Sequence, residues 1–557
     1  MKPPATGIQG MTTSRFALSV CMIVKNEAHQ LGEALDNFAD FADELVVVDT
    51  GSRDDTQVVA SRFTPYVYHF PWCDDFSAAR NFSLEKARGR YVLWLDADDR
   101  FEPAMQGCLR ELKKHFSTGR AFYFILENVD ETGPSWSCYQ LRCVPNRPDV
   151  RFEGRVHEQL YPSVERAGIE GVLTDIVVRH YGYRERGKFL EKTRRNLAIL
   201  DKERLEGRDD EHVHYYRALA QEALGLFPQA VSSMERALVH LERRIHQRFG
   251  DNPSPDLQSV LEGYLFLARN YHRLGEIPSA RRNLLRANAL ADEDSNVSYR
   301  LGCMFQKLGL HLQALECFGK ALSTGTRRVR FHPSDRLPPP ATLHLHRAFS
   351  LFCMNRETEG LRALEEVSSR GISPSEMFEW LGLRALQGGE YQLSLQFYRA
   401  ARQRGELSSD GLCNLGLIQA KLGDVCGALE CYDAAIEKTP GHPAALANRA
   451  HLHFRMNEWD KAEKEFEALV RDRHRDLDLL LPLALISLKK GNRNGFARAE
   501  RLIFDQVSPP PAVRSSEDRF RWLGDVLDAE RKGMPAVWAR QIARELGPDA
   551  PPGSHFL

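Results

Sequence analysis

The sequence has no excess of charge of either sign. Its 557 residues include 75 lysines and arginines and 76 aspartates and glutamates, so the formal net charge is −1 at pH 7. Proteins that hold nucleic acids or anionic membrane surfaces by electrostatics usually carry an excess of basic residues. Neither a nucleic acid nor a membrane surface is therefore predicted as a partner of this chain.

Long apolar runs are also missing. No stretch reaches the ~18 consecutive apolar residues that a membrane-spanning helix requires, so no span is predicted. Residues 1–14 lack the apolar segment of a secretory signal and are expected to form a disordered leader. The chain is accordingly expected to be soluble and cytoplasmic.

Regular cysteine spacing is the third absence. The eleven cysteines are odd in number and scattered through segments of helical pattern. Such usage is typical of free, buried thiols in a reducing compartment. Cys138 and Cys143 are close in sequence, but no second cysteine pair or histidine has the spacing of a zinc site. Neither disulfides nor structural zinc are therefore predicted.

The apolar pattern changes near residue 210, and the chain is longer than one hydrophobic core usually serves. Before that point, strands are predicted at 18–24, 44–49, 91–95 and 122–126, and helices at 33–41, 56–63 and 188–204. Alternation of strands and helices predicts βαβ units and a mainly parallel sheet. The last of these helices is expected to lead out of the α/β domain.

A period of 34 residues appears in the second half. Asn355, Gly389, Gly423, Asn457 and Gly491 follow one another at steps of 34, Gly275 and Gly309 keep the same step, and Gly225 starts the series. Five residues after these marks stands a small residue, at Ala230, Ala280, Ala314, Gly360, Ser394, Ala428 and Ala462. A Gly or Asn turn followed by a small residue lets two short helices cross closely. Residues 415–440 fit the tetratricopeptide pattern position by position, which predicts an all-α solenoid.

The predicted domain bounds are 15–187 for the α/β domain, 188–211 for a linker helix and 212–504 for about eight helical pairs. Residues 505–557 are expected to form a Pro-rich segment and a C-terminal helix with a tail. Two roles stay open for the repeats. They are a scaffold that stabilises or dimerises the chain, or a concave groove for a peptide or protein.

Carboxylates gather directly after the predicted strand at 91–95, where Asp96, Asp98 and Asp99 follow five apolar residues. Strand ends are where an open α/β sheet places its ligand. Asp96 and Asp98 are one residue apart, so both can turn toward one hard cation. Mg²⁺ and Mn²⁺ take oxygen ligands of this kind, with phosphate oxygens completing the shell. The alternative is an acidic turn that binds nothing.

Polar residues also follow the other predicted strands. Asn26 and Glu27 come after the first strand, and Asp49 ends the second strand just before Gly51 and Ser52. A nucleotide would lie at such strand ends. Alternatively, Glu27 starts the next helix, where the helix dipole favours an acid, and Gly51 and Ser52 form only a turn and a helix cap.

Arg80 and Asn81 lie in a predicted helical stretch between two strands. A guanidinium at this place can pair with a diphosphate or stack near a base. The alternative is a surface ion pair of Arg80 with Asp74 or Asp75.

Four segments occur in the order found in family 2 glycosyltransferases, and this part of the chain resembles that family. The segments are Ile23–Glu27, Val47–Thr56, Ala79–Phe82 and Leu95–Asp99, and the resemblance spans roughly residues 16–200. It implies a GT-A fold, which is a Rossmann-like α/β fold of nucleotide-diphospho-sugar transferases. It also implies a nucleotide-sugar donor such as a UDP-hexose, a divalent Mn²⁺ or Mg²⁺ ion, and mostly inversion at the anomeric carbon. With its repeats the chain is similar to bacterial glycosyltransferase–repeat fusions, a group that includes peptide S-glycosyltransferases.

The resemblance assigns roles on the donor side. It implies that Asp49 accepts hydrogen bonds from the base or ribose, and that Asp96 and Asp98 handle the ribose and the metal diphosphate, with Asp98 as the direct ligand. A bound metal would stabilise the leaving nucleoside diphosphate. His180 is a further candidate metal ligand, and a packed, hydrogen-bonded histidine is the alternative. The remaining donor-binding candidates are Asn26, Glu27, Gly51, Ser52, Arg80 and Asn81.

An inverting transfer also needs a base for the proton of the acceptor. Gly154–Gln159 falls after the metal motif, in the region where the family places its acceptor-side acid. Glu158 is predicted as the base, and His157 as a residue that orients it, contacts phosphate or binds metal. The usual acidic pair of the family is His-Glu here, and a structural ion pair of Arg155 with Glu153 or Glu158 is the alternative.

The sequence thus predicts a metal-dependent glycosyltransferase whose repeats present an acceptor, with a peptide or protein as the first candidate. A lipid-linked or cell-envelope saccharide is the second candidate acceptor. A different class of protein, an interaction scaffold with a catalytically silent GT-A domain, is the third hypothesis. The joint presence of Asp49, Arg80, Asp96 and Asp98 argues against that third hypothesis.

Overall fold

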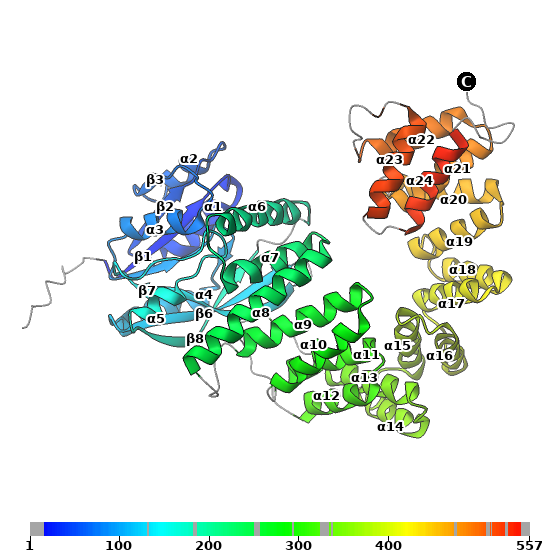
Figure 1. Ribbon diagram of the computed structural model, residues 1–557, viewed down its shortest axis with the longest axis horizontal. Coiled ribbons are helices and arrows are strands. Elements are labelled where there is room, and N and C mark those ends of the chain that lie inside the picture. The colour runs from blue at the N-terminus through cyan, green and yellow to red at the C-terminus, as the bar shows by residue number, and fades with distance from the viewer. Residues whose placement is uncertain are drawn as a thin grey trace, which may run out of the picture. The chain divides into compact units, whose positions relative to one another are not determined.

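The computed structural model describes residues 16–130, 133–181, 186–249, 257–291, 294–323, 334–335, 338–472, 476–507, 513, 515–529 and 533–546. The predicted disordered leader and the Pro-rich residues 508–512 lie outside these ranges. The chain forms two compact units, residues 1–343 and 344–557 (Figure 1). The sheet, the predicted linker helix and the first repeat helices all belong to the first unit.

The first unit contains a mixed sheet. Its strands are β1 Leu18–Val24, β2 Glu44–Asp49, β3 Val67–His69, β4 Tyr91–Trp94, β5 Asp99–Arg100, β6 Arg120–Asp130, β7 Gly133–Pro145, β8 Glu170–His180 and β9 Ser334–Asp335. Within the described residues the order across the sheet is β3-β2-β1-β4-β7-β6-β8-β5, with β9 beside β7. Three strand pairs on the β3 side, β2–β3, β1–β2 and β1–β4, are parallel.

Helices cover both faces of the parallel half. Side chains of a strand point alternately to opposite faces. Leu18, Val20 and Met22 pack with helix α1, Ala28–Ala39, whereas Cys21 packs on the other face with helix α3, Phe76–Lys86. Helix α2, Thr56–Ser61, connects β2 to β3. The predicted βαβ arrangement is confirmed for this half of the sheet.

The other half of the sheet departs from the prediction of a mainly parallel sheet. Strand β7 is antiparallel to both β4 and β6, and β5 is antiparallel to β8. The sequence predicted only the 122–126 part of β6 and missed β7 and β8. Strand β8 is largely half-exposed, and β7 mixes polar with apolar residues, so neither forms the continuous apolar run of a fully buried strand.

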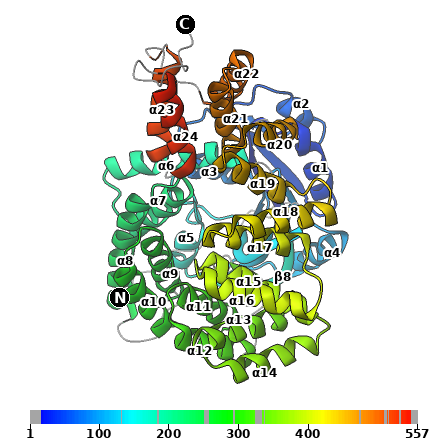
Figure 2. The same ribbon diagram turned by 90° about the vertical axis from the view of Figure 1, so that its right-hand side faces the viewer.

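The remaining helices of the first unit include the predicted linker helix and the first repeats. They are α4 Pro103–Leu112, α5 Tyr161–Arg166, α6 Arg186–Leu205, α7 Glu211–Ala223, α8 Phe227–Phe249, α9 Leu257–Arg273, α10 Ile277–Leu290, α11 Ser295–Lys307 and α12 His311–Ser323; helix α13, Pro340–Cys353, crosses into the second unit. Helices α7 to α12 pack against one another in sequence order (Figure 2).

The second unit continues the helical pattern. Its helices are α14 Glu357–Ser368, α15 Pro374–Gln387, α16 Tyr391–Arg404, α17 Ser409–Leu422, α18 Val425–Lys438, α19 Pro443–Arg455, α20 Trp459–Asp472, α21 Leu477–Lys489, α22 Arg493–Phe504, α23 Ser516–Ala529 and α24 Gly533–Leu546. The described part after residue 505 contains two helices, α23 and α24, where the sequence predicted one. These two pack on each other, and α24 also packs on α21.

The periodic marks are the points where the backbone turns between paired helices. All eight marks, at Gly225, Gly275, Gly309, Asn355, Gly389, Gly423, Asn457 and Gly491, have a positive φ between 58° and 90°. Glycine adopts this left-handed conformation without a Cβ clash, and asparagine tolerates it better than most residues. Six of the small residues five positions later are fully buried, as expected for a close helix crossing. The tetratricopeptide solenoid is therefore confirmed.

Two expectations from composition can be compared with the described residues. In that part of the chain, no helix combines the length and the apolar character needed to cross a membrane. All eleven cysteines lie in the described residues and are thiols, as predicted, but only six are buried. Cys73, Cys108 and Cys426 are exposed, so the expectation of buried thiols was wrong for these three.

Candidate active site

The candidate site begins at the carboxyl end of β4, where the chain turns from Trp94 into the carboxylate segment. Asp99 starts β5, which pairs with β8 so that Asp99 lies opposite His180. The Tyr181 amide donates a hydrogen bond to the Asp98 carbonyl at 3.1 Å. The register of two short antiparallel segments thereby brings a distant histidine beside the predicted metal motif.

Asp98, Asp99 and His180 form a possible set of metal ligands. The Nδ1 atom of His180 lies 2.9 Å from an Asp99 oxygen and 3.3 Å from an Asp98 oxygen. One candidate ligand atom from each of the three residues lies within 4.8 Å of the other two. Asp96, which was predicted as a ligand together with Asp98, turns toward Arg80, so its ligand role stays a prediction.

The charges of this group are strongly coupled. Burial is the main cause that raises the pKa of Asp98 to about 6. His180 acts against this increase, and the nearby Asp99 and Asp96 carboxylates add to it. Burial acts to lower the pKa of His180, but the hydrogen bond to Asp99 and the charges of the three carboxylates raise it to about 9. Three carboxylates around one imidazole form a negative site that would attract a cation.

Arg80 joins two of the predicted residues. Its Nε donates to Glu158 at 2.5 Å, and its Nη2 donates to Asp96 at 2.9 Å. The Arg80 side chain is 8% exposed, and its guanidinium lies 4.5 Å from the centroid of the Trp94 ring. Its Nη1 is buried and has no hydrogen-bond partner. The arginine therefore links Asp96 to Glu158, and one of its N–H groups is left without a hydrogen-bond partner.

The alternative pairing of Arg80 with Asp74 or Asp75 does not occur. Asp75 is the N-cap of α3 and accepts a hydrogen bond from the Ala78 amide at 2.8 Å. Asp74 accepts from the Trp72 indole at 3.0 Å. Asp75 thus stabilises the start of the helix that carries Arg80, and Asp74 binds a side chain in the segment before it.

The Asp96 carboxylate is held in its ionised form. Burial acts to raise its pKa, but Arg80, Arg142 and His180 outweigh burial and lower the pKa to about 2. The Asp96 amide also donates to an Asp99 oxygen at 2.9 Å. Asp96 is therefore a fixed negative charge between two arginines.

Arg142 is a site residue that the sequence did not predict. Its side chain is 2% exposed, and its Nη1 donates to Asp99 at 3.0 Å and lies 3.9 Å from Asp96. Its guanidinium also lies 3.9 Å from the centroid of the Trp94 ring. The available sequence signal was a single charge inside the run Leu141–Val144, and it was missed because β7 was not predicted as a strand.

The ends of β1 and β2 bring Asn26, Asp49, Gly51 and Ser52 together. The Asn26 amide donates to the Ser52 hydroxyl at 2.9 Å, and the Arg53 amide donates to the Asn26 side chain at 2.8 Å. Asp49 is almost completely buried and accepts from the Ser52 amide at 3.2 Å and from Gln57 at 2.6 Å. Burial opposes ionisation of Asp49, but these hydrogen bonds hold its pKa below the ordinary value.

Two other donor-side candidates are used by the protein itself. The Glu27 carboxylate accepts a hydrogen bond from the Gln30 side chain at 2.7 Å. The main-chain amide of Glu27 donates to the Thr56 hydroxyl at 2.8 Å. Both polar atoms of the Asn81 amide pair with the main chain of Phe152, at 3.0 and 2.8 Å. Asn81 therefore links α3 to the segment before Glu158 by two hydrogen bonds. Its contact with the nucleotide-sugar donor stays a prediction.

Glu158 lies in a loop from Glu153 to Gln159, referred to below as the 153–159 loop. Two main-chain hydrogen bonds of 3.0 Å between Glu153 and Gln159 close it. The His157 ring stacks on Tyr216 of α7 at 4.1 Å, and its role toward Glu158 stays a prediction. The alternative structural ion pair of Arg155 with Glu153 or Glu158 was wrong, because Arg155 pairs with Glu206 and Glu153 with Arg166.

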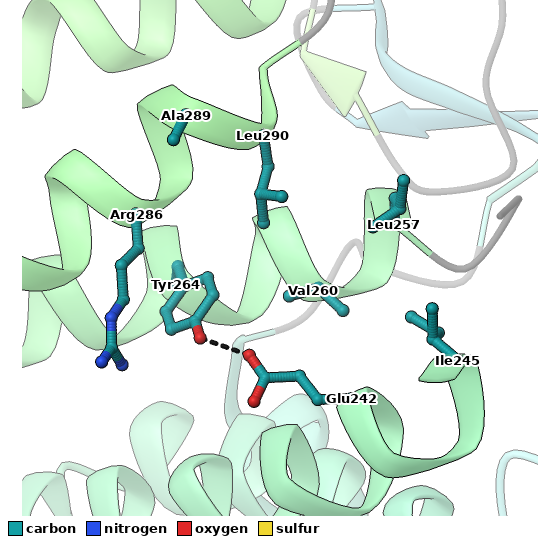
Figure 3. Close-up of a pocket in the computed structure, with 8 residues that line it drawn as sticks. All are labelled: Glu242, Ile245, Leu257, Val260, Tyr264, Arg286, Ala289 and Leu290. Atoms are coloured by element: carbon teal, nitrogen blue, oxygen red, sulfur yellow. Dashed lines mark hydrogen bonds between the residues drawn. The ribbon is translucent and has the colours of Figure 1, made fainter. Parts of the chain in front are cut away.

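A hollow of about 520 Å³ lies apart from these residues, between α8, α9 and α10 (Figure 3). Apolar side chains such as Val260 and Leu290 line it, together with Glu242, which accepts a hydrogen bond from the Tyr264 hydroxyl. None of the predicted site residues lines this hollow. The candidate active site is therefore the polar network at the end of β4.

Two parts of the chain match known families. Residues 19–168 match the family described as Glycosyl transferase family 2, and residues 381–443 and 419–483 match tetratricopeptide repeats. The chain carries a family 2 glycosyltransferase domain. Arg80, Asp96 and Glu158 lie within the matched part of this glycosyltransferase domain, whereas His180 and the helices α6 and α7 lie beyond it.

The glycosyltransferase domain also has similar curated relatives. A TPR repeat-containing protein of Synechococcus elongatus is 36% identical over 173 residues, which are 30% of this chain and 42% of that protein. The SPbeta prophage-derived glycosyltransferase SunS of Bacillus subtilis is 26% identical over 185 residues, which are 32% of this chain and 43% of SunS. The chain thus spans about two fifths of the length of the curated relatives that it matches.

Among solved structures, a chain from a study of pilF of Pseudomonas aeruginosa aligns with 46% of this chain and 95% of its own length. The TM-score of that alignment is 0.25 and the sequence identity is 15%.

Proposed function

We propose that this chain transfers a sugar from a nucleoside diphosphate to an acceptor, with a divalent metal ion at the end of β4. The observation that carries the proposal is the joined network of Asp98, Asp99 and His180 with Asp96, Arg80 and Glu158 inside a family 2 glycosyltransferase domain. The network combines a candidate cation site with a candidate base across one arginine.

The donor half rests on the chemistry of the side chains present. Asp98, Asp99 and His180 offer carboxylate oxygen and imidazole nitrogen, a donor set that suits Mn²⁺ and, with fewer protein ligands, Mg²⁺. When bound, the metal would supply Lewis-acid stabilisation of the leaving nucleoside diphosphate. Arg80 keeps a buried Nη1 without a partner, and a phosphate oxygen would satisfy that group. A UDP-hexose is the first candidate donor.

The acceptor half rests on Glu158. In an inverting transfer, this carboxylate would take the proton of the acceptor as the acceptor attacks the anomeric carbon. Arg80 fixes one carboxylate oxygen of Glu158 while holding Asp96 on its other side. The tetratricopeptide repeats favour a peptide or protein as acceptor, because such arrays commonly bind extended or helical segments. A lipid-linked or cell-envelope saccharide is the second candidate.

The donor half is tested with Asp98→Asn. The purified full chain is incubated with UDP-glucose and Mn²⁺, and released UDP is measured. We expect the variant to lose activity by ~100-fold or more. The substitution would remove a carboxylate ligand of the metal that stabilises the leaving group. Asp149→Asn is the matched control, since Asp149 is an exposed carboxylate that pairs with Arg147, and it should match the wild type. Negligible release by all three proteins with UDP-glucose and other nucleotide sugars would support the silent scaffold instead.

The acceptor half is tested with Glu158→Gln. We expect calorimetric binding of UDP with Mn²⁺ to persist while turnover falls by ~100-fold or more, as general-base catalysis commonly contributes 10²–10⁴-fold. Near-normal turnover would remove Glu158 as the base. Intact mass spectrometry of peptides and proteins incubated with enzyme and donor would detect an added hexose. If only saccharides are modified, the peptide acceptor is wrong.

A further inference from the structure

The 153–159 loop is held by helices that lie beyond the matched family domain. The match ends at residue 168, while α6 and α7 cover residues 186–205 and 211–223. Both helices belong to the same compact unit as the sheet. The surroundings of Glu158 are therefore built partly by the start of the repeat array.

Main-chain atoms of three consecutive loop residues are bound from outside the loop. The Ser77 hydroxyl donates to the Gly154 carbonyl at 2.5 Å, and the Phe76 amide donates to the Arg155 carbonyl at 2.7 Å. The Arg155 amide donates to Glu203 of α6 at 3.2 Å, and the His212 ring of α7 donates to the Val156 carbonyl at 3.1 Å. The loop is thus clamped between α3 and the helices α6 and α7.

Tyr216 of α7 contacts the residues on either side of Glu158. Its ring stacks on His157, the residue before Glu158, with an interplanar angle of 7°. Its hydroxyl accepts a hydrogen bond from the Gln159 side chain at 3.2 Å, on the residue after Glu158. Tyr216 also packs beside an apolar cluster of Val156 with Ile199 and Leu200 of α6. One tyrosine therefore contacts both neighbours of the candidate base.

The backbone of the loop explains why such support is needed. His157 has φ 56°, a left-handed conformation that is unfavourable for a residue with a Cβ. Gly154 has φ 91°, and a Cβ there would lie 2.9 Å from the His212 ring. A conformation of this kind persists only where its surroundings hold it. The direction of Glu158 toward Arg80 depends on that conformation, because Glu158 directly follows His157.

We propose that Tyr216 and His212, from the first helix of the repeat array, are positioning residues that set the 153–159 loop and so place Glu158 against Arg80. The inference rests on the proposed function, since it assigns the loop to the acceptor side of the transfer. The repeat array then completes the catalytic site of its own chain in addition to any acceptor that it binds.

The test compares Tyr216→Ala with Tyr216→Phe in the full chain. Tyr271→Ala is the matched control, because Tyr271 is a tyrosine of α9 whose hydroxyl donates to Glu235 and which makes no contact with the loop. Hydrogen–deuterium exchange of the peptide that spans residues 153–159 is measured first. We expect Tyr216→Ala to speed its exchange by ~10-fold or more, because the loop would open locally. Tyr216→Phe and Tyr271→Ala should match the wild type there.

Kinetics of UDP-glucose hydrolysis with Mn²⁺ are measured on the same proteins. We expect Tyr216→Ala to lower kcat by ~10–100-fold while the KM for UDP-glucose changes less than about twofold, since a misplaced base affects the chemical step. Tyr216→Phe should restore most of kcat, because the ring stacking remains. A general loss of stability in Tyr216→Ala would instead speed hydrogen–deuterium exchange outside the loop as well, for example in β1 and β2.

Unchanged loop exchange in Tyr216→Ala would overturn the inference, whatever the activity. Faster exchange with an unchanged kcat would overturn the positioning role. If the wild type turns over no nucleotide sugar, the proposed function fails instead, and the exchange result still shows whether α7 sets the loop.

Discussion

At the level of single residues, the most informative group is the Arg80 guanidinium. It contacts Asp96 on one side and Glu158 on the other, and it lies over the Trp94 ring. Arg142 lies over the same ring and contacts Asp99. Two buried arginines beside one indole therefore hold three carboxylates, and His180 lies beside the fourth, that of Asp98. Fixed positive charges such as these two guanidinium groups are what an enzyme offers to a developing negative charge.

Replacement of Arg142 should affect stability more than any surface arginine. Arg142→Ala leaves the fully buried Asp99 with His180 as its remaining close cation, so we expect a loss of ~3 kcal/mol in the free energy of unfolding. Arg147→Ala removes an exposed pair with Asp149 and should cost less than ~1 kcal/mol. Urea unfolding followed by circular dichroism measures both. Equal losses in the two variants would show that the Arg142 pair is not important for folding.

At the level of elements, a helix or strand can be predicted from the sequence where the residues that determine it lie within its own segment. Strands β1 and β2 were predicted because both are buried, apolar runs. The helical pairs were predicted because each needs one left-handed turn residue, which leaves a mark in the sequence. Strands β7 and β8 carry no such mark, because their places are set by pairing with β6.

The same reasoning applies to the candidate site. Asp96, Asp98, Arg80 and Glu158 were found from motifs, and the structure brings them close together with His180. The pairing of His180 with Asp99 depends on the register of β5 and β8, across 81 positions of sequence. The stacking of His157 on Tyr216 depends on how α7 packs, which no local pattern of the sequence reveals.

The left-handed turn marks give a matched pair of glycine substitutions. Gly309 has φ 70° in the turn between α11 and α12, whereas Gly319 lies inside α12, and at both positions an added Cβ would have no atom within 4 Å apart from its chain neighbours. We expect Gly309→Ala to lose ~1–2 kcal/mol of stability, because a residue with a Cβ is strained against its own backbone at positive φ. Gly319→Ala should gain ~0.5–1 kcal/mol, since alanine favours a helix interior. Thermal unfolding should rank Gly319→Ala above the wild type and Gly309→Ala below it, and the reverse order would contradict the turn assignment.

A buried histidine of α13 predicts a pH dependence of stability. His346 is 4% exposed and packs edge-on against Trp380, so burial, with a smaller effect of Arg384, lowers its pKa to about 3. The unfolded chain takes up a proton as pH falls below ~6.5, and the folded chain does not. Stability is therefore lost as pH falls from ~6.5 toward 3, at up to ~1.4 kcal/mol per pH unit.

The measurement for His346 compares slopes, so that a change in absolute stability does not matter. Urea unfolding between pH 7.5 and 5.5 stays above the range where most carboxylates titrate. His346→Phe keeps a ring beside Trp380 and removes the titrating group. We expect a smaller loss of stability per pH unit in the variant than in the wild type. Equal slopes would mean that His346 does not remain neutral in the folded chain.

At the level of the whole molecule, the division of the chain into two units does not follow the division into families. The first unit joins the glycosyltransferase domain to α6 and the repeat helices up to α12, whereas the matched tetratricopeptide repeats at 381–483 lie in the second unit. In repeat arrays each repeat contacts mainly the repeats next to it, so a stabilising effect at one point acts mainly on neighbouring repeats. A ligand at the end of β4 should therefore stabilise the first unit selectively.

Binding of UDP with Mn²⁺ tests this expectation for the full chain. A ligand that binds only the folded form at a free concentration 100 times its Kd adds ~2.7 kcal/mol to the stability of the part that it binds. We expect slower hydrogen–deuterium exchange in β4, the 153–159 loop and α7, with unchanged exchange in α17 to α22. Asp98→Asn should abolish the difference. Equal protection in both units would show that they respond as one body, and no protection in either would contradict the donor site itself.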